Sequence, residues 1–264
     1  MEHKIASVKN QLIKKVLLLK EKSKIRRQKN RFIIEGLREL SLAIKANYTI
    51  EMILFYPELI SKEELKNIVH TSNLIEISKA IFTKLAHRST TEGIIAIAKT
   101  KDHSLNLIRF HSENPLLLIA EAPEKPGNIG AILRTADAAG IDAVLIANPK
   151  TDLYNPNIIR SSVGCIFTNT IGVGSTKEIV SFLKQQNITI YAAALHKEAE
   201  EYTNQDYTKA SAIVVGTEAT GLSNSWLENN KKIIIPMQGD IDSLNVSVSA
   251  AVILFEAVRQ RNLN

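Results

Sequence analysis

The stretch IIIPMQGDIDSLNVSVSAAVILFEA, residues 233–257, contains a strand, a polar loop and a helix in succession. Its three leading isoleucines are β-branched and apolar, which predicts a buried strand. Pro236 ends that strand, because proline has no N–H to give to a sheet ladder. From Val246 to Ala257, apolar residues recur at helical spacing. The stretch therefore predicts a βα unit of an α/β fold.

Two polar residues, Ser243 and Asn245, come just before this helix, so their side chains lie at the loop and not in the core. Ser and Asn are preferred at helix N-caps, and capping alone explains their presence. Open parallel α/β sheets also bind ligands beyond the carboxyl ends of their strands. This stretch by itself leaves both interpretations open.

The composition describes a globular protein and excludes several classes. A chain of 264 residues, 45% of them hydrophobic, is long enough for two domains with full cores. No apolar run is long enough to span a membrane, and the N-terminus lacks a signal-peptide apolar region. The single cysteine, Cys165, excludes an internal disulfide, and the scattered histidines offer no zinc-ligand spacing. We expect a cytoplasmic protein without membrane contact or bound metal.

Positive charge gathers at the N-terminal end. Residues 1–50 carry 13 Lys and Arg against 4 Glu, whereas the whole chain has a net charge of +6, so the remainder is net negative. Nine basic residues and one acid lie between Lys14 and Arg31. Such a run suits a solvated helix face. It also suits the phosphate backbone of a nucleic acid, because cations gain free energy by releasing the counterions of phosphates, and we expect nucleic-acid contact here.

Strands alternate with helices on both sides of a polar segment, 104–114, which predicts a linker between a domain at 1–103 and a domain at 115–264. The first domain predicts strands at 32–34, 50–56, 74–77 and 93–98, helices at 5–19, 37–46, 63–70 and 78–86, and a basic loop at 23–31. The second predicts strands at 116–121, 143–147, 168–173, 188–194 and 212–216, and helices at 128–139, 155–162 and 176–186, before the strand and helix quoted above.

Two further polar clusters follow predicted strands of the second domain. EKPGNIG (124–130) leads into a helix that Asn128 is expected to cap, and Arg134 is a lone charge in its apolar turns. GTEATGLS (216–223) carries Glu218, which either holds a cation such as Arg134 or is simply a loop acid. A surface ion pair is the alternative role for Arg134. Neither cluster is a Walker loop or a GxGxxG fingerprint, which disfavours a generic nucleotide-binding enzyme.

In this order, the three clusters closely resemble the SpoU/TrmH family of RNA 2′-O-methyltransferases. The matching segments are NxGxxxRT (128–135), GxExxGLS (216–223) and IPMxG (235–239) followed by SLNVS (243–247). RSSxG (160–164) resembles a further, weaker family segment. In the first domain, RFIIEG (31–36) and TEGI (91–94) are similar to recurrent segments of the family's substrate-binding module, a ribosomal-protein-like RNA-binding fold.

The resemblance implies a parallel sheet with a deep trefoil knot, of the SPOUT class, and a smaller N-terminal α/β RNA-binding domain. It implies that S-adenosylmethionine binds in the knot against the backbone of Gly216, Ile235 and Leu244. It also implies a homodimer through the C-terminal domain, with the last helix in the interface.

By the same resemblance, the catalytic residues are expected to be Arg134, Asn128, Glu218, Ser243 and Asn245. Arg134 would be the base for the ribose 2′-hydroxyl, or would orient that hydroxyl, because arginine with a pKa above about 12 is an awkward base. Asn128 would hold the substrate or Arg134, and Glu218 would orient Arg134 or the motif loops. Ser243 and Asn245 would position the hydroxyl and shape the cofactor loop.

The function implied is methyl transfer to a ribose 2′-hydroxyl in RNA, with ribosomal RNA favoured by the extra N-terminal domain. The alternatives are a tRNA 2′-O-methyltransferase and a non-catalytic RNA-binding protein of the same fold. The RNA is expected to be single-stranded or looped, because unstacked nucleotides expose the ribose.

Overall fold

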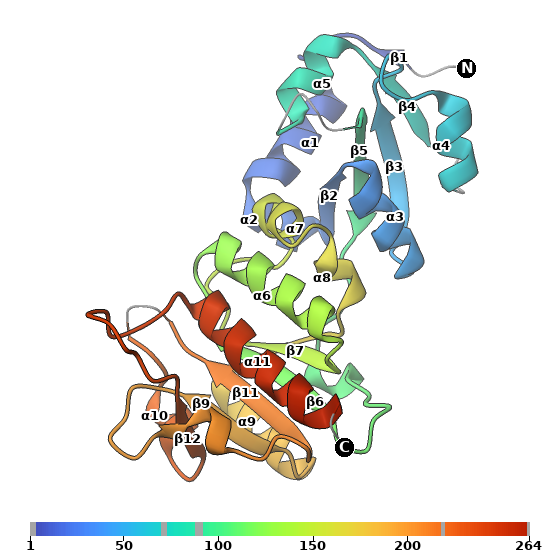
Figure 1. The fold of residues 1–264 in the computed structure, drawn as a ribbon. Helices are drawn as coiled ribbons and strands as arrows, with labels where there is room; N and C mark the ends of the chain where they lie inside the picture. The colour runs from blue at the N-terminus through green and yellow to red at the C-terminus, as the bar shows by residue number, and fades with distance from the viewer. Residues whose placement is uncertain (1–3, 70–72, 88–91, 218–219, 263–264) are drawn as a thin grey trace. The chain divides into compact units, whose positions relative to one another are not determined.

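The computed structural model describes residues 4–69, 73–87, 92–217 and 220–262 (Figure 1). Contacts divide the chain into two compact units. Unit 1 contains Met1–Asp102 and Asp152–Thr168, and unit 2 contains His103–Thr151 and Asn169–Asn264. The domain limits expected from the sequence stay a prediction. The contacts add that residues 152–168, which we call the inserted segment, pack with the N-terminal part of the chain.

Unit 1 is built on a five-stranded mixed sheet. β1 and β3 run parallel to β4, and β5 is antiparallel to β3 and β2. In spatial order the strands are β1 (Lys4–Ile5), β4 (Leu74–Ile77), β3 (Ile50–Phe55), β5 (Ile94–Lys99) and β2 (Arg31–Glu35). The helices are α1 (Gln11–Glu21), α2 (Ser23–Lys29), α3 (Leu37–Lys45), α4 (Lys62–Ile68), α5 (Lys79–Leu85), α7 (Pro156–Ser161) and α8 (Cys165–Thr168).

Two expectations for the N-terminal end are wrong. The basic stretch predicted as a loop forms the helix α2, because it contains no glycine or proline and ends at Asn30, which adopts the left-handed conformation that closes helices. The first helix begins at Gln11 and not at Ile5. The side chain of Asn10 caps it by accepting a hydrogen bond from the Leu12 N–H, and Ile5 pairs with β4 instead.

Aromatic packing and one buried ion pair attach the inserted segment to the rest of unit 1. The ring of Tyr154 lies 4.3 Å from that of Phe32, and the Tyr154 hydroxyl is 3.2 Å from the hydroxyl of Tyr48. Arg26, which is 3% exposed, donates from Nε to Asp152 Oδ2 at 2.5 Å. Because Arg26 is buried, it does not belong to the solvent-facing positive charge of α2.

Unit 2 is built on a seven-stranded sheet in which every pair of described neighbours is parallel. In spatial order the strands are β10 (Glu200–Glu201), β12 (Lys231–Ile234), β9 (Thr189–Ala193), β11 (Ser211–Val215), β6 (Leu116–Glu121), β7 (Ala143–Ala147) and β8 (Ile171–Gly174). The helices are α6 (Pro126–Ala139), α9 (Thr176–Gln185), α10 (Asn224–Leu227) and α11 (Val246–Asn262), with 3-10 turns at Leu105–Leu107 and Tyr202–Asn204. The strand expected at 168–173 begins only at Ile171, because Thr168 ends α8.

Helices cover both faces of this sheet, which explains why its central strands are buried throughout. α6 and α11 lie side by side over one face (Figure 1). On the other face, Ile179 and Leu183 of α9 and Trp226 of α10 pack with Leu117 and Ile119 of β6. The expected α/β fold, with a parallel C-terminal sheet and a smaller N-terminal domain, is confirmed, whereas the trefoil knot stays a prediction.

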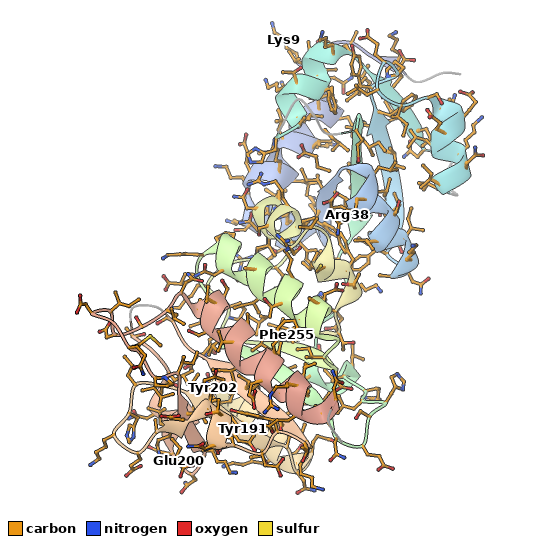
Figure 2. All side chains as sticks on the ribbon, in the orientation of Figure 1. Lys9, Arg38, Tyr191, Glu200, Tyr202 and Phe255 are labelled. Atoms are coloured by element: carbon orange, nitrogen blue, oxygen red, sulfur yellow. The ribbon has the colours of Figure 1, made fainter. Side chains whose placement is uncertain are left out.

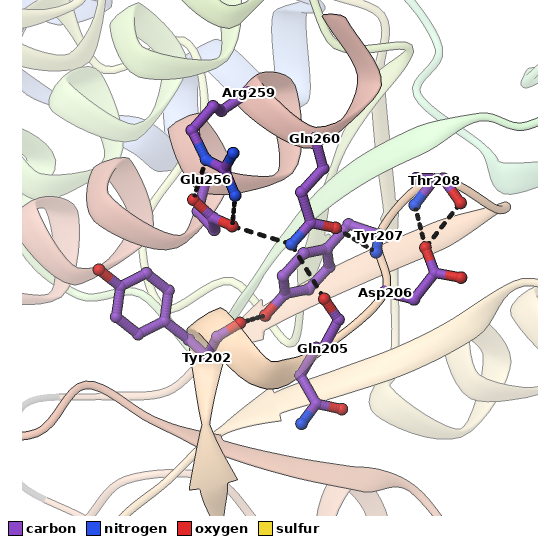
Figure 3. Close-up of polar contacts among 8 residues, drawn as sticks. All are labelled: Tyr202, Gln205, Asp206, Tyr207, Thr208, Glu256, Arg259 and Gln260. Atoms are coloured by element: carbon purple, nitrogen blue, oxygen red, sulfur yellow. Dashed lines mark hydrogen bonds and ion pairs between the residues drawn. The ribbon is translucent and has the colours of Figure 1, made fainter. Parts of the chain in front are cut away.

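The C-terminal end of α11 is fixed by a polar network (Figure 3). Gln260 accepts a hydrogen bond from the Tyr207 N–H at 2.9 Å and donates to the Gln205 carbonyl at 2.9 Å. Tyr207 is fully buried, and its hydroxyl donates to the Tyr202 carbonyl. These bonds hold the C-terminal end of α11, and its N-terminal end follows the loop 235–245. None of the helices in the described ranges is both long and apolar enough to cross a membrane.

Candidate active site

A cavity of about 780 Å³ in unit 2 lies at the carboxyl ends of β9, β11 and β12. Three loops form its walls, and they are the loops that follow these strands. Of the residues expected from the sequence to contact the cofactor or the substrate, the lining includes Gly216, Ile235, Ser243, Leu244 and Asn245. The structure therefore brings together residues that are up to 29 positions apart in sequence, as ligand sites at strand ends require.

Two residues that follow β11, Thr217 and Gly221, pair with each other beside the cavity. The backbones of Thr217 and Gly221 exchange two hydrogen bonds of 3.1 Å, and Gly221 has a φ of +65°, which glycine adopts without strain. A Cβ on Gly216 would lie 2.7 Å from Leu222 N and closer still to the carbonyl group of Gly221. Glycine at position 216 is therefore required by the close approach of backbone. Glu218 lies outside the described residues.

A buried carboxylate that the sequence did not single out holds this loop in place. Glu121, the last residue of β6, is 6% exposed and accepts hydrogen bonds from Ser223 N at 2.8 Å and Ser223 Oγ at 2.7 Å. It also accepts one from Thr176 Oγ1 at 2.8 Å. Buried carboxylates need such donors. The sequence feature that could have indicated this role is an acid, Glu121, at the end of a strand whose other residues are apolar.

Asn245 caps α11, as the simpler interpretation of its position predicted. Its Oδ1 accepts from Ser247 N at 3.0 Å and from Ser247 Oγ at 2.6 Å. Its Nδ2 lies 3.4 Å from Asn128 Oδ1, so the same side chain also connects the loop to α6. Ser243 is exposed at the cavity wall. Capping and a role in the site are therefore compatible at Asn245.

Asn128 is not the cap of α6. The helix begins at Pro126, whose fixed φ suits the first helical position, and Lys125 takes the capping position without a side-chain hydrogen bond. Asn128 consequently lies in the first turn, from which its side chain reaches Asn245.

Arg134 lies further along α6, and it is the one expected catalytic residue in the described ranges that the structure leaves apart from the others. Six residues correspond to about 9 Å along the axis and about 120° around it from Asn128. Arg134 is exposed and is not among the described residues that line the cavity. Its expected partner, Glu218, is outside the described ranges, so the pairing stays a prediction.

The chemistry that this cavity offers is binding by backbone groups and small polar side chains. Within the described ranges, no group of three or more His, Cys, Asp or Glu side chains is arranged to hold a metal ion. The expectation of a metal-independent reaction stays a prediction.

Two family models match the chain. The SpoU rRNA Methylase family model matches residues 115–255, and the MRM3-like substrate binding domain model matches residues 10–96. The 23S rRNA (guanosine(2553)-2′-O)-methyltransferase RlmP of Bacillus subtilis (strain 168) is 30% identical over 252 residues, which cover 95% of this chain and 97% of that protein.

Solved structures agree with this match over nearly the whole chain. A crystal structure of an RNA 2′-O ribose methyltransferase is 41% identical, with a TM-score of 0.84, and covers 98% of this chain and 99% of its own. The SpoU methyltransferase AviRb from Streptomyces viridochromogenes, in complex with the cofactor AdoMet, is 27% identical, with a TM-score of 0.87, and covers 96% of this chain and 98% of its own. Since the SpoU model covers more than half of the chain and a relative of nearly equal extent is 30% identical, this chain belongs to the SpoU rRNA methylase family.

Proposed function

We propose that this chain transfers a methyl group from S-adenosylmethionine to a ribose 2′-oxygen of ribosomal RNA. The observation that carries the proposal is the cavity at the strand ends, where the loops of two family-like motifs meet. The third motif joins them through the hydrogen bond between Asn128 and Asn245. The second family model supports ribosomal RNA, since a substrate-binding domain precedes the methylase domain in this chain.

The cavity has the size and the wall that an adenosine-containing cofactor needs. About 780 Å³ falls within the range of small-molecule sites. Gly216, Ile235 and Leu244 would hold the cofactor with their backbone groups. The paired backbones of Thr217 and Gly221 hold these two wall residues in place before the ligand arrives. When bound, S-adenosylmethionine supplies a methyl group already activated by the positive sulfonium.

The protein side chains orient the ribose and manage its proton. Asn245 and Asn128 present amide groups beside the cavity, and Ser243 adds a hydroxyl at its wall. These groups position the 2′-hydroxyl, and such positioning supplies much of the acceleration in two-substrate reactions. Arg134 removes the hydroxyl proton or orients the hydroxyl and the neighbouring phosphate, with Glu218 directing its guanidinium.

Arg134 reaches the reacting atoms within a homodimer, which we propose forms through α11. Phe255 on this helix is 47% exposed (Figure 2). Val248 is 46% exposed, and the half-buried Val252 lies between them at helical spacing. An exposed apolar stripe of this kind marks an interaction surface. Because α6 packs on α11, a partner on this stripe also approaches α6 and Arg134. Replacing Val248 and Phe255 with Asp should convert a dimer into a monomer in light scattering.

Three exposed cations, namely Lys22 just before α2 and Lys24 and Arg27 within it, supply phosphate contacts for the RNA. Ribosomal RNA as the substrate implies a cytoplasmic location, which stays a prediction.

The test is methyl transfer from labelled S-adenosylmethionine to purified ribosomal RNA and, separately, to transfer RNA. We expect ribosomal RNA to be labelled and the modified ribose to appear as a reverse-transcription stop at low dNTP. Arg134→Ala should keep its circular dichroism and its S-adenosylmethionine affinity but lose methyl transfer. Arg109→Ala, at an exposed arginine of unit 2, should keep all three properties. Undiminished transfer by Arg134→Ala contradicts the role given to Arg134. Labelling of transfer RNA alone contradicts the substrate.

A further inference from the structure

A second cavity, of about 540 Å³, lies in unit 1 and belongs to no part of the proposed methyl-transfer site. Three sequence segments that the proposed reaction does not use meet there. Glu35 and Gly36 come from RFIIEG, Glu92 comes from TEGI, and Arg160 comes from RSSxG. The last of these belongs to the inserted segment, so this cavity exists only because that segment packs with unit 1.

One side of this cavity carries a buried guanidinium. Arg26 is 3% exposed, and its Nη1 donates to the carbonyls of Leu19 at 2.7 Å and Lys20 at 3.0 Å, while its Nε is taken by Asp152. None of the hydrogen bonds between described residues uses Nη2, although Arg26 lines the cavity. Arg160 lines the same cavity from α7 and is exposed. A phosphate accepts hydrogen bonds from such a pair of arginines.

Carboxylates occupy another part of the cavity wall. The position of a Cβ on Gly36 would be 2.7 Å from Glu39 Oε2 and 3.6 Å from Glu92 Oε2, so both carboxylates lie next to the backbone of Gly36. Burial raises the pKa of Glu39, and the negative charges of Glu92 and Glu35 raise it further. Glu92 accepts from the Leu37 N–H, but the carboxyl of Glu39 keeps acceptor capacity for a ligand with N–H groups.

We propose that this cavity binds one unpaired guanine nucleotide of the substrate RNA, with its phosphate at Arg26 and Arg160 and the N1–H and N2–H groups of its base at Glu39 and Glu92. This inference rests on RNA being the substrate of the proposed function. The adjacent N–H donors of guanine match the two oxygens of a carboxylate, whereas uracil places its single N–H between two carbonyls that a carboxylate repels. Unpaired bases present these edges, and a cavity of this size holds a nucleotide.

The test is fluorescence anisotropy of the full chain, without S-adenosylmethionine, with labelled U4GU4 and U9 oligoribonucleotides. The parent should bind U4GU4 about 10-fold more tightly than U9, the size expected for one base read by paired hydrogen bonds. Glu39→Gln should remove this preference and leave U9 binding unchanged. Glu63→Gln, at an exposed glutamate of α4, should keep the preference.

A second variant tests the phosphate end and does not depend on Glu39. Arg160→Gln should weaken both oligonucleotides equally and reduce the slope of log affinity against log salt by about 0.7. Equal affinity of the parent for U4GU4 and U9, or an unchanged preference in a folded Glu39→Gln, overturns the proposal. Free GMP is the last competitor. If it displaces labelled U4GU4 at the same concentration as unlabelled U4GU4 does, the cavity binds a free nucleotide and the proposal is overturned.

Methyl transfer measured on the same samples separates the two proposals. Transfer to ribosomal RNA without a guanine preference refutes only the cavity assignment. A guanine preference without transfer refutes only the enzymatic one.

Discussion

Removing the carboxylate of Asp152 should strongly destabilise unit 1. The side chains of Arg26 and Asp152 are 3% and 8% exposed, so Asp152→Ala leaves the charge of Arg26 buried without its counterion. Breaking a buried pair in this way costs about 3–5 kcal/mol. Two carbonyls still accept from Nη1 of Arg26, which places the expected loss at the lower end, about 3 kcal/mol. With a urea m-value of about 2 kcal/mol per molar, the midpoint should fall by about 1.5 M.

The assay uses the position of the single tryptophan. Trp226 lies in unit 2, so its fluorescence reports on unit 2, while circular dichroism at 222 nm reports on both units. In Asp152→Ala, part of the dichroism transition should move to lower urea while the fluorescence transition stays close to that of the parent. Lys4→Ala is the control, because the Lys4–Glu76 pair is exposed, at 62% and 27%, and should contribute less than about 1 kcal/mol.

The double variant Arg26→Met, Asp152→Ala tests whether the uncompensated charge of Arg26 causes the loss of stability. If the uncompensated charge causes the loss, the double variant should recover most of it, since neither charge is then buried. A double variant as unstable as Asp152→Ala would refute this reasoning, and so would a loss below about 1 kcal/mol in the single variant.

Three further predictions concern the cavity loop, the basic helix and a helix cap. Gly216→Ala should abolish S-adenosylmethionine binding in calorimetry while Gly127→Ala, where a Cβ meets nothing within 4 Å, should keep it. Neutralising Lys22, Lys24 and Arg27 together should weaken RNA binding and lower the salt slope by up to about 2. Neutralising the exposed Lys66, Lys177 and Lys184 should leave the slope unchanged, and an equally unchanged slope for the first set assigns those cations to a solvated face. The Ser175 backbone N–H and hydroxyl lower the pKa of Glu178, so its contribution is present above the unfolded pKa of about 4.3 and is lost as pH falls through the lower folded pKa. Glu178→Gln should therefore flatten the fall of the melting temperature below about pH 5, and a fall as steep as in the parent would contradict this.

Local patterns were sufficient where a segment's structure depends on its own residues. The strands at 74–77, 116–121 and 143–147 have the expected bounds, because apolar runs bounded by polar residues fit a covered sheet. Ser61 caps α4 and forms a capping box with Glu64, a pairing of Ser with Glu three residues later that marks helix starts in a sequence. Gly140 ends α6 in the left-handed conformation that glycine commonly adopts just after a helix.

Failures occurred where distant residues decide the outcome. Arg26 was counted among solvent-facing cations, but Asp152, which lies 126 positions later, makes its burial possible. The role of Glu121 depends on Ser223, 102 positions away, and no local spacing indicates that contact. At the site, the motif residues lining the cavity were found from the resemblance. The six-residue spacing of Asn128 and Arg134 in the predicted helix already placed them on different faces of α6, whereas the contact between Asn128 and Asn245, 117 positions apart, could not be read from local spacing.

The inserted segment has a consequence for dividing this protein into parts. The chain passes between the two units three times, at 102–103, 151–152 and 168–169, and not once through a single tether. A fragment ending near residue 103 therefore lacks Asp152 and Tyr154, and would leave Arg26 and the ring of Phe32 without their partners. Chimeras that exchange the N-terminal part between relatives should retain activity only when residues 152–168 are exchanged with it. Recombination near residue 103 alone would combine an N-terminal part and an inserted segment from different proteins.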